Sequence, residues 1–148
     1  MDETSAKIES LIRDSIPIAQ TMDIRVVASD PNRMELSAPF LGNHNDKGTA
    51  FAGCLYSLAV LCGWAYVNRI LLDYGLKAVA MVADSSMKYL KPVRGDFRSV
   101  CECRDEGKIG EFAAKLKTAG KGSINLETTV IADGVVAGSF SGRYVAKI

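Results

Sequence analysis

The spacing of apolar residues predicts a short amphipathic helix near the start of the chain, over about residues 4–16. The apolar residues that share its face are Ile8, Leu11, Ile12 and Ile16. Because proline lacks a backbone N–H and clashes with the preceding turn, Pro17 is expected to stop this helix. Two strands over 24–29 and 33–38 follow, joined by a turn at Asp30-Pro31-Asn32.

Residues 48–68 form the most unusual stretch of the chain because none of them is charged. The stretch is long enough for a membrane span, which takes about 20 apolar residues. It also contains glycine, threonine, serine and asparagine, and amphipathic strands flank it. A helix that is apolar on nearly every side must be surrounded by lipid or by protein. We favour a central helix wrapped by a curved sheet, with no membrane span, and a left-handed cap at Gly75.

The second half of the sequence predicts mainly strands. The expected strands cover 78–90, 97–103, 123–132 and 135–145. Asp133-Gly134 is a strong hairpin signal between the last two, and a helix of a turn or two, beginning near Ile109, is expected to end at Gly120. The order of elements predicts an α+β fold, with about six antiparallel strands over one central helix, in a single domain spanning 1–148.

Composition narrows the classes of function. The 148 residues include 18 Lys and Arg against 17 Asp and Glu, so the net charge of +1 gives none of the basic field typical of nucleic-acid binders. Four cysteines and one histidine predict neither a disulfide framework nor a metal site, and no cofactor is expected. Residues 1–7 are polar and begin with acids, unlike a secretory signal, so we expect a cytoplasmic protein with reduced, buried thiols.

Two motifs at the ends of the uncharged stretch resemble a known family. Residues 45–53 (NDKGTAFAG) are similar to the N-x-x-G-T-x-x-G-G segment that opens the central helix of hotdog-fold acyl-CoA thioesterases. Residues 82–92, followed by Gly95-Asp96, resemble the third strand of that fold and its exit. The closest resemblance, through residues 47–64, is to the thioesterase-like domain found at the C-terminus of some bacterial GNAT-type acetyltransferases.

The resemblance implies a hotdog fold, a homodimer or dimer of dimers, and cleavage of acyl-CoA or acyl carrier protein thioesters. It assigns stabilisation of the oxyanion to the backbone N–H groups of Ala52 and Gly53, at the positive end of the central helix. It also implies that Asn45 positions the attacking water or the acyl carbonyl. The alternatives are that the small residues only allow close packing and that Asn45 is an ordinary loop residue.

The catalytic acid is where the chain departs from the family pattern. Many relatives carry an acid, a serine and a histidine at the positions of Val60, Val82 and Phe51. Strict alternation places Asp84 on the same strand face as Val82 and Ser86, so Asp84 is the preferred general base. The alternative for Asp84 is a structural carboxylate. Asp46 is the second candidate, although an acid beside a lysine is commonly a solvated pair.

Substrate contacts are expected from the loop before the helix and from basic residues near the end of the third strand. The expected contacts are Gly48, Thr49, Phe51, Ser86, Lys88, Lys91 and Arg94. The basic residues, with Arg98, would attract coenzyme A phosphates or an acidic carrier protein. The alternative is that they are solvated side chains at a sheet edge. An acyl tunnel is one interpretation of four further side chains, and plain core is the other. These are Phe51, Leu55, Met81 and Met87.

Two functions from different classes remain open. The leading hypothesis is an acyl-thioester hydrolase, and the alternative is a non-catalytic acyl-CoA binding or regulatory module, suggested by the apolar residues at the three family positions. A dehydratase on the same fold would need a histidine–carboxylate pair, for which His44 is the single imidazole available.

Overall fold

The computed structural model describes residues 1–148 and begins with two helices. Helix α1 (Glu3–Ser15) is capped by Asp2, whose carboxylate accepts a hydrogen bond from the Ser5 N–H at 2.7 Å. The helix ends where it was expected to end. Pro17, however, does not only stop α1, because it opens a second short helix, α2 (Pro17–Thr21). Proline is well suited to the first turn of a helix, where its missing N–H has no partner to lose.

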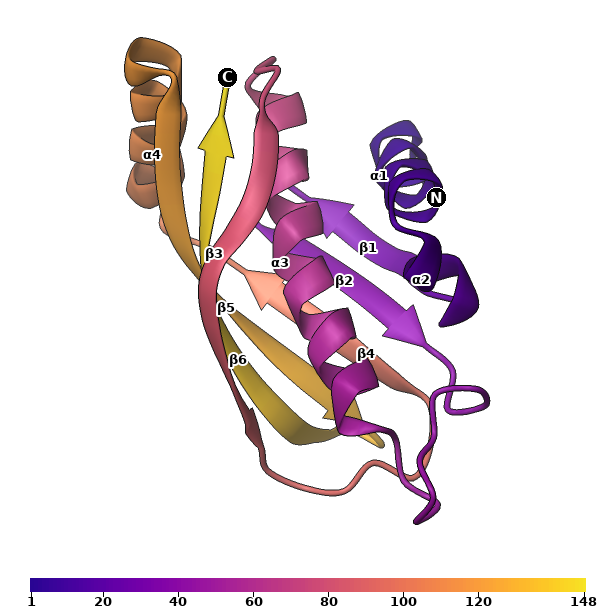
Figure 1. The fold of residues 1–148 in the computed structure, drawn as a ribbon. Helices are drawn as coiled ribbons and strands as arrows, with labels where there is room; N and C mark the ends of the chain where they lie inside the picture. The colour runs from indigo at the N-terminus through magenta and orange to yellow at the C-terminus, as the bar shows by residue number, and fades with distance from the viewer.

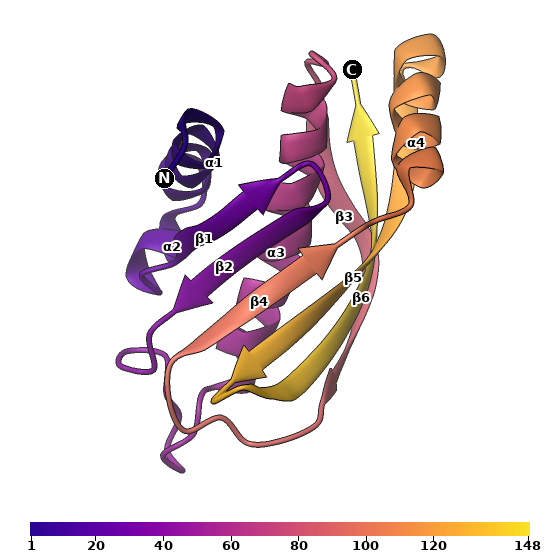
Figure 2. The same cartoon turned by 180° about the vertical axis from the view of Figure 1, so that it is seen from behind.

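A curved antiparallel sheet forms the body of the protein (Figures 1 and 2). Its strands are β1 (Arg25–Asp30), β2 (Arg33–Ala38), β3 (Val79–Tyr89), β4 (Phe97–Glu102), β5 (Lys121–Ala132) and β6 (Val135–Lys147). The six strands lie in the order β1-β2-β4-β5-β6-β3. Asp133 and Gly134 join β5 to β6 with positive φ angles of 52° and 70°, as a tight hairpin turn requires. The predicted α+β fold with a long helix against an antiparallel sheet is confirmed.

Helix α3 (Ala52–Asp73) lies against the concave face of this sheet. By length and composition alone it would suffice to cross a membrane, with a mean hydropathy of 1.4 over its most apolar window, but 67% of that window is buried inside the fold. Its single arginine, Arg69, is held by Asp73 at 2.9 Å and by the Ser29 hydroxyl at 2.8 Å. Helix α4 (Glu106–Ala119) packs on β5 and is longer than the turn or two expected.

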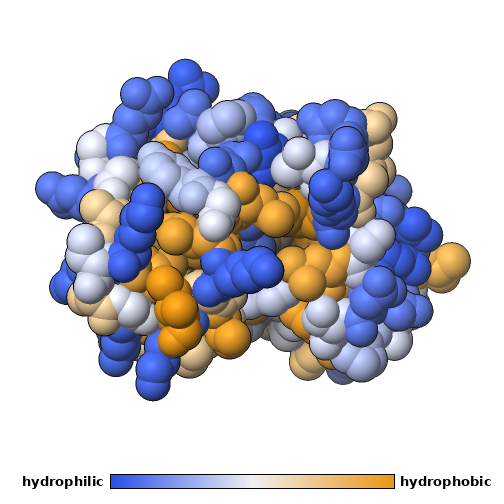
Figure 3. All heavy atoms as spheres, turned by 90° about the horizontal axis from the view of Figure 1, so that it is seen from above, coloured by the Kyte–Doolittle hydropathy of each residue, from blue (hydrophilic) through white to orange (hydrophobic).

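Helix α3 is not buried on all sides. A cluster of 35 buried hydrophobic residues surrounds most of the helix, but Tyr56, Val60 and Trp64 remain only partly buried. Apolar side chains are also exposed near its far end, where Leu72 is 49% and Val79 66% accessible. Viewed from that end, apolar atoms form a band between hydrophilic flanks (Figure 3). The protein therefore leaves one strip of its central helix open.

A β-bulge in β3 changes which side chains face the helix. Val82 pairs with Tyr144 and Asp84 with Arg143, so Ala83 is an extra residue in the strand. Because Tyr144 and Arg143 are consecutive residues of one strand, Val82 and Asp84 lie on opposite faces of the sheet. The expectation that Asp84 and Ser86 share a face with Val82 is therefore wrong. Asp84 and Ser86 lie together on the outer face.

A buried acid lies on that outer face between two arginines. The Glu35 side chain is 5% exposed, and its carboxylate accepts hydrogen bonds from Arg33 and Arg98, each at 2.5 Å. Burial alone would raise the pKa of Glu35, but these hydrogen bonds and charges outweigh it, and the pKa is lowered. Arg98 is thus bound to Glu35 on the outer face of the sheet. It does not join Lys91 and Arg94, with which it was grouped from the sequence.

Replacing Gly63 with alanine is expected to destabilise the fold by about 1–3 kcal/mol, the usual cost of overpacking a core. A Cβ at this position would overlap the phenol ring of Tyr144, which packs directly on the helix backbone. The matched control is Gly110→Ala in α4, where a Cβ meets nothing within 4 Å and alanine should stabilise the helix by about 0.5–1 kcal/mol. Chemical denaturation measures both variants, and equal effects would contradict the packing of Tyr144 on Gly63.

Glu35→Gln is expected to lower the free energy of unfolding at neutral pH by about 1.5–3 kcal/mol, the range for hydrogen bonds to charged groups. Because the folded-state pKa lies below the ordinary value of 4.5, the stabilisation is present above pH 4.5 and is lost as the pH falls through the folded-state pKa. Denaturation curves between pH 7 and 3 should therefore converge for the two proteins in acid. A constant difference over this range would contradict the assignment.

Candidate active site at the start of the central helix

A tight loop precedes α3 and is fixed from both sides. The Asn45 N–H donates to the Thr49 carbonyl at 2.8 Å, and Gly48 takes the positive φ of 73° that this turn needs. The Ala50 N–H donates to the Val93 carbonyl at 2.7 Å, which ties the loop to the connection between β3 and β4. The first residues of the helix are therefore held in a defined position.

The Asn45 amide shapes this loop from inside. Its Oδ1 accepts hydrogen bonds from the backbone of Lys47 at 2.8 Å and of Thr49 at 3.2 Å, and its Nδ2 donates to the Thr49 hydroxyl at 2.8 Å. These contacts use both acceptor sites of the oxygen and one of the two amide hydrogens. The second hydrogen of the Asn45 side-chain amide has no partner in the protein and is free to bind a ligand.

Asn43 is a supporting residue that the sequence did not single out. It is 2% exposed, and its Nδ2 donates to the carbonyls of Met22 at 2.9 Å and of Pro39 at 2.8 Å. Its own carbonyl accepts from the Phe51 N–H at 2.8 Å, just before α3. Asn43 thus anchors the loop to the N-terminal region, and only its burial distinguishes it from its neighbour Asn45.

The first turn of α3 carries two N–H groups without a partner. The N–H groups of Cys54 and Leu55 donate to the Phe51 carbonyl at 2.9 and 3.1 Å, whereas those of Ala52 and Gly53 have no acceptor in the protein. Phe51 precedes the helix and provides no side-chain cap. These two donors lie at the positive end of a 22-residue helix. They are the groups to which the family resemblance assigned stabilisation of the oxyanion.

Gly53 lies directly under the ring of Phe51. A Cβ on Gly53 would lie 2.5 Å from the edge of that ring. Phe51 is 54% exposed, so its ring lies beside the two free donors and not in the core. Phe51, which was predicted to contact the substrate, therefore lies next to the start of α3.

A cleft of about 280 Å³ opens beside the first turn. Its walls come from the loop, from α3 and from the end of β3, and they include Asn45, Thr49, Ala52, Leu55, Tyr89 and Lys91. The Tyr89 hydroxyl donates to the Ala52 carbonyl at 3.1 Å and joins β3 to the helix start. The fold thus brings several of the predicted site residues to one cavity.

The predicted carboxylates lie outside this cleft. Asp84 has a side chain 76% exposed on the outer sheet face, where its carboxylate contacts Arg143 at 3.3 Å. Asp46 is 82% exposed in the loop and pairs with Lys47 at 2.9 Å. No acid lines the cleft. The site therefore consists of backbone and amide donors next to apolar walls.

The basic residues are divided among three locations. Lys91 lines the cleft and also a neighbouring cavity of about 170 Å³, which Arg94 lines as well. Lys88 pairs with Ser139 in the sheet register, on the same outer face as Ser86. Lys91 is thus the basic residue that lines the candidate site, and Arg94 lines the cavity next to it.

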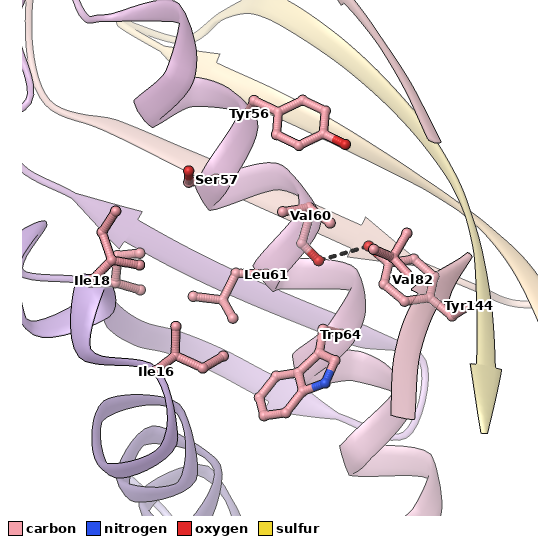
Figure 4. A pocket seen from close by; sticks show the side chains of 10 residues that line it. Ile16, Ile18, Tyr56, Ser57, Val60, Leu61, Trp64, Val82 and Tyr144 are labelled. Carbon is pink, nitrogen blue, oxygen red and sulfur yellow. Dashed lines mark hydrogen bonds between the residues drawn. The ribbon is translucent and has the colours of Figure 1, made fainter. Parts of the chain in front are cut away.

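A second, apolar groove of about 270 Å³ follows α3 away from the cleft (Figure 4). Its sides come from the segment around α2 and from β3 and β6, and α3 forms its floor. Residues that line it include Ile16, Ile18, Ser57, Val60, Trp64 and Val82. Of the residues expected to line an acyl tunnel, Phe51, Leu55, Met81 and Met87, none belongs to this groove.

No thiol is suited to nucleophilic chemistry. All four cysteines are free, and Cys62, Cys101 and Cys103 are buried. Burial raises the pKa of the Cys62 thiol to about 12 and also raises the pKa of Cys54, the half-buried cysteine near the cleft. At neutral pH these two thiols are protonated, so neither supplies a thiolate.

Comparison with known proteins identifies the class. Residues 5–148 match the family described as "Putative thioesterase (yiiD_Cterm)". The chain therefore belongs to this family, and its fold is that of the hotdog thioesterases. The closer resemblance to the thioesterase-like domain of GNAT-type acetyltransferases, as a domain standing alone, stays a prediction.

Solved structures with the same fold extend over almost the whole chain. A protein of unknown function from Chlorobaculum tepidum is 30% identical, with a TM-score of 0.93 over 97% of this chain and 93% of that one. A "putative thioesterase" from Shewanella oneidensis is 26% identical, with a TM-score of 0.89 over 100% of both chains. A "probable thioesterase" from Pseudomonas aeruginosa, 24% identical over 97% and 95%, shares the fold with a TM-score of 0.81.

Proposed function

We propose that the protein hydrolyses acyl thioesters at the start of α3. The observation that carries the proposal is the pair of unpartnered N–H groups of Ala52 and Gly53 beside a cleft of about 280 Å³. A thioester carbonyl placed against this turn meets two donors and the positive helix end. Both stabilise the negative oxygen that develops as water attacks. Membership of the thioesterase family supports the same reaction.

The remaining parts of the site position the reactants. The side-chain N–H of Asn45 that has no partner in the protein orients the attacking water or the carbonyl, as the family resemblance implied. Of the two acids, Asp46 is the one whose loop borders the cleft, but its carboxylate is exposed and paired with Lys47, so we assign the uptake of the water proton to solvent and not to a side chain. Asp84 lies on the face of the sheet opposite to the helix, where it contacts Arg143 at 3.3 Å, and we assign it no step.

The substrate carrier is proposed to be coenzyme A or acyl carrier protein. Lys91 lines the cleft and Arg94 lines the neighbouring cavity, and both provide positive charge for a phosphate or for an acidic protein surface. The four unpaired cysteines agree with our proposal of a cytoplasmic location, where thiols stay reduced.

A non-catalytic acyl-CoA binding module is the second candidate function. The cleft has no carboxylate in its lining, and this observation favours binding without turnover. Release of free thiol from a panel of acyl-CoAs separates the two functions, because a binding module is stabilised by acyl-CoA but releases no thiol.

Ala52→Pro is expected to reduce thioester hydrolysis by about 10²–10³-fold, the usual effect of removing one oxyanion donor. Ala52 is the first residue of α3, and Phe51 before it has an extended backbone (φ −65°, ψ 132°). Proline fits both conditions, so the variant deletes this N–H while the helix should persist. The measurement is kcat/KM for acyl-CoA, with Ala52→Gly as the control that keeps the N–H.

Full activity in Ala52→Pro, with a thermal midpoint like that of the natural protein, would remove Ala52 from the oxyanion site. Thiol release no faster than in buffer, across acyl chains from acetyl to palmitoyl, would overturn the hydrolase proposal itself.

We also propose that the protein is a homodimer joined through β3. This strand of 11 residues lies at the sheet edge with one side unpaired. Its first half exposes Val79, Met81 and Val82, at 66%, 44% and 39%, without a lysine or proline to discourage pairing. A second copy would cover both the apolar side chains and the free backbone groups.

Sedimentation should therefore give a mass of about twice the 15.9 kDa of the chain. Met81→Lys is expected to shift the protein toward monomer because it places a charge at the proposed contact. The control is Val27→Lys on β1, the opposite sheet edge, where the natural side chain is 54% exposed. A mass of one chain at all concentrations, or an equal effect of both variants, would contradict the assignment.

A further inference from the structure

We infer that the end of the molecule where α3 finishes is a docking surface for a bilayer that contains anionic lipids. This surface, the lysine end, combines two exposed apolar side chains with four exposed lysines. Its residues are Leu72, Tyr74, Lys77, Lys117, Lys121 and Lys147. None of them belongs to β3, the strand proposed to join two copies, and none lines the cleft. Contact with a membrane is therefore independent of the proposed hydrolysis.

Three segments that are far apart in the sequence meet at the lysine end (Figures 1 and 2). Helix α3 finishes there, and the turn that follows it carries Lys77. The Ile148 N–H donates to the Gly120 carbonyl at 2.9 Å, which ties the end of the chain to the end of α4. In the register of β5 and β6, Lys121 lies directly opposite Lys147. These segments therefore bring their lysines to one surface.

The lysines of this surface are not neutralised by the protein. The ion pairs of the protein engage other cations. Asp73, the acid closest in sequence to Lys77, is held by Arg69 at 2.9 Å. Like charges that lie directly opposite each other on neighbouring strands are unfavourable, and Lys121 and Lys147 stand in this relation. A negatively charged surface that approaches them relieves this repulsion.

The apolar residues of the lysine end suit an interface between water and lipid. Leu72 is 49% and Tyr74 50% exposed, although they lie at the end of the helix that forms the centre of the fold. Viewed from this end, an apolar band runs between hydrophilic flanks (Figure 3). Tyrosine is enriched at membrane surfaces, and a lysine stem lies along apolar groups while its ammonium group reaches the headgroups. The apolar band and its flanks thus match the two layers of a bilayer surface.

The type of cation favours a lipid surface over one specific anion. All four basic residues are lysines, which are point charges on flexible stems, whereas arginine makes fixed bidentate contacts with a defined phosphate or carboxylate. A cluster of this size beside apolar residues is typical of contacts with anionic lipids, and each lysine strengthens binding by about five-fold. Because the net charge of the whole chain is only +1, the attraction is confined to this end.

Flotation with lipid vesicles measures this contact. The protein should bind vesicles of phosphatidylcholine with about a third of phosphatidylglycerol at least about 100-fold more tightly than vesicles of phosphatidylcholine alone. The Debye length falls from about 10 Å in about 0.1 M salt to about 3 Å in about 1 M salt, so high salt should remove most of this difference. No preference for the anionic vesicles would overturn the inference.

Replacing three lysines together, by Lys117→Gln, Lys121→Gln and Lys147→Gln, should weaken binding to the anionic vesicles by about 100-fold. Leu72→Ser removes an apolar contact without changing the charge and should weaken binding by about ten-fold. All four side chains are exposed, so the fold should persist, and the thermal midpoint of each variant checks this. Unchanged vesicle binding by the triple lysine variant would contradict the docking surface.

The matched control removes three positive charges from other parts of the molecule. Lys7→Gln, Lys88→Gln and Arg104→Gln lie on α1, on β3 and just before α4. This variant has the same net charge as the triple lysine variant and should keep vesicle binding within about three-fold of the natural protein, because distant charges are screened. Equal losses in the two variants would show that overall charge causes the attraction and would overturn the assignment of the lysine end.

Hydrolysis of soluble acyl-CoA separates the lysine end from the proposed active site. The start and the end of α3 lie roughly 30 Å apart at about 1.5 Å per residue, so contact at the lysine end leaves the cleft of the same chain uncovered. The triple lysine variant should therefore release thiol at the natural rate. Vesicle binding without thiol release would support the docking surface and overturn hydrolysis. Thiol release without a preference for anionic vesicles would support hydrolysis and overturn the docking surface.

Discussion

A helix of 22 residues whose first 17 residues carry no charge has to be covered on nearly every side, and the rest of this fold is arranged around that requirement. The concave sheet covers one side of α3, and the N-terminal helices cover another. A strip between α2 and β3 stays open and forms the apolar groove. The first turn of the helix is also uncovered, and there the N–H groups of Ala52 and Gly53 have no partner in the protein. The cleft and the groove are thus two consequences of one packing arrangement.

The bulge at Ala83 decides which chemistry β3 contributes to that arrangement. One extra residue reverses the alternation, so that Ser85 turns inward to meet Tyr56 while Asp84 turns outward to Arg143. Without the bulge, an ionisable carboxylate would lie against the helix, where burial costs free energy unless a partner compensates it. With the bulge, the inner face of β3 instead carries the Ser85 hydroxyl, which is already hydrogen-bonded to Tyr56. The inner wall therefore stays free of charge along its length.

Much of the fold follows from local signals in the sequence. The run without charge predicts α3, Asp133-Gly134 predicts the last hairpin, and Gly120 does end α4 with a positive φ of 74°. The start of the central helix, including its two free donors, also lies where the motif places it. The Ala83 bulge could not be predicted, because it depends on pairing with β6, far away in sequence. For the same reason Asn43, which is anchored to Met22 and Pro39, looked like any polar loop residue.

The proposed hydrolysis separates binding of the substrate from stabilisation of its transition state. Apolar contacts with a chain are the same in the ground state and in the transition state, so by themselves they tighten binding without accelerating the reaction. They gain catalytic value when they fix the carbonyl against donors that act only as charge develops on its oxygen. The Ser57 hydroxyl donates to the Gly53 carbonyl within α3, and this bond helps to fix the turn that carries the two free N–H groups. Substrate contacts therefore add to the proposed reaction where they hold the carbonyl against these two groups.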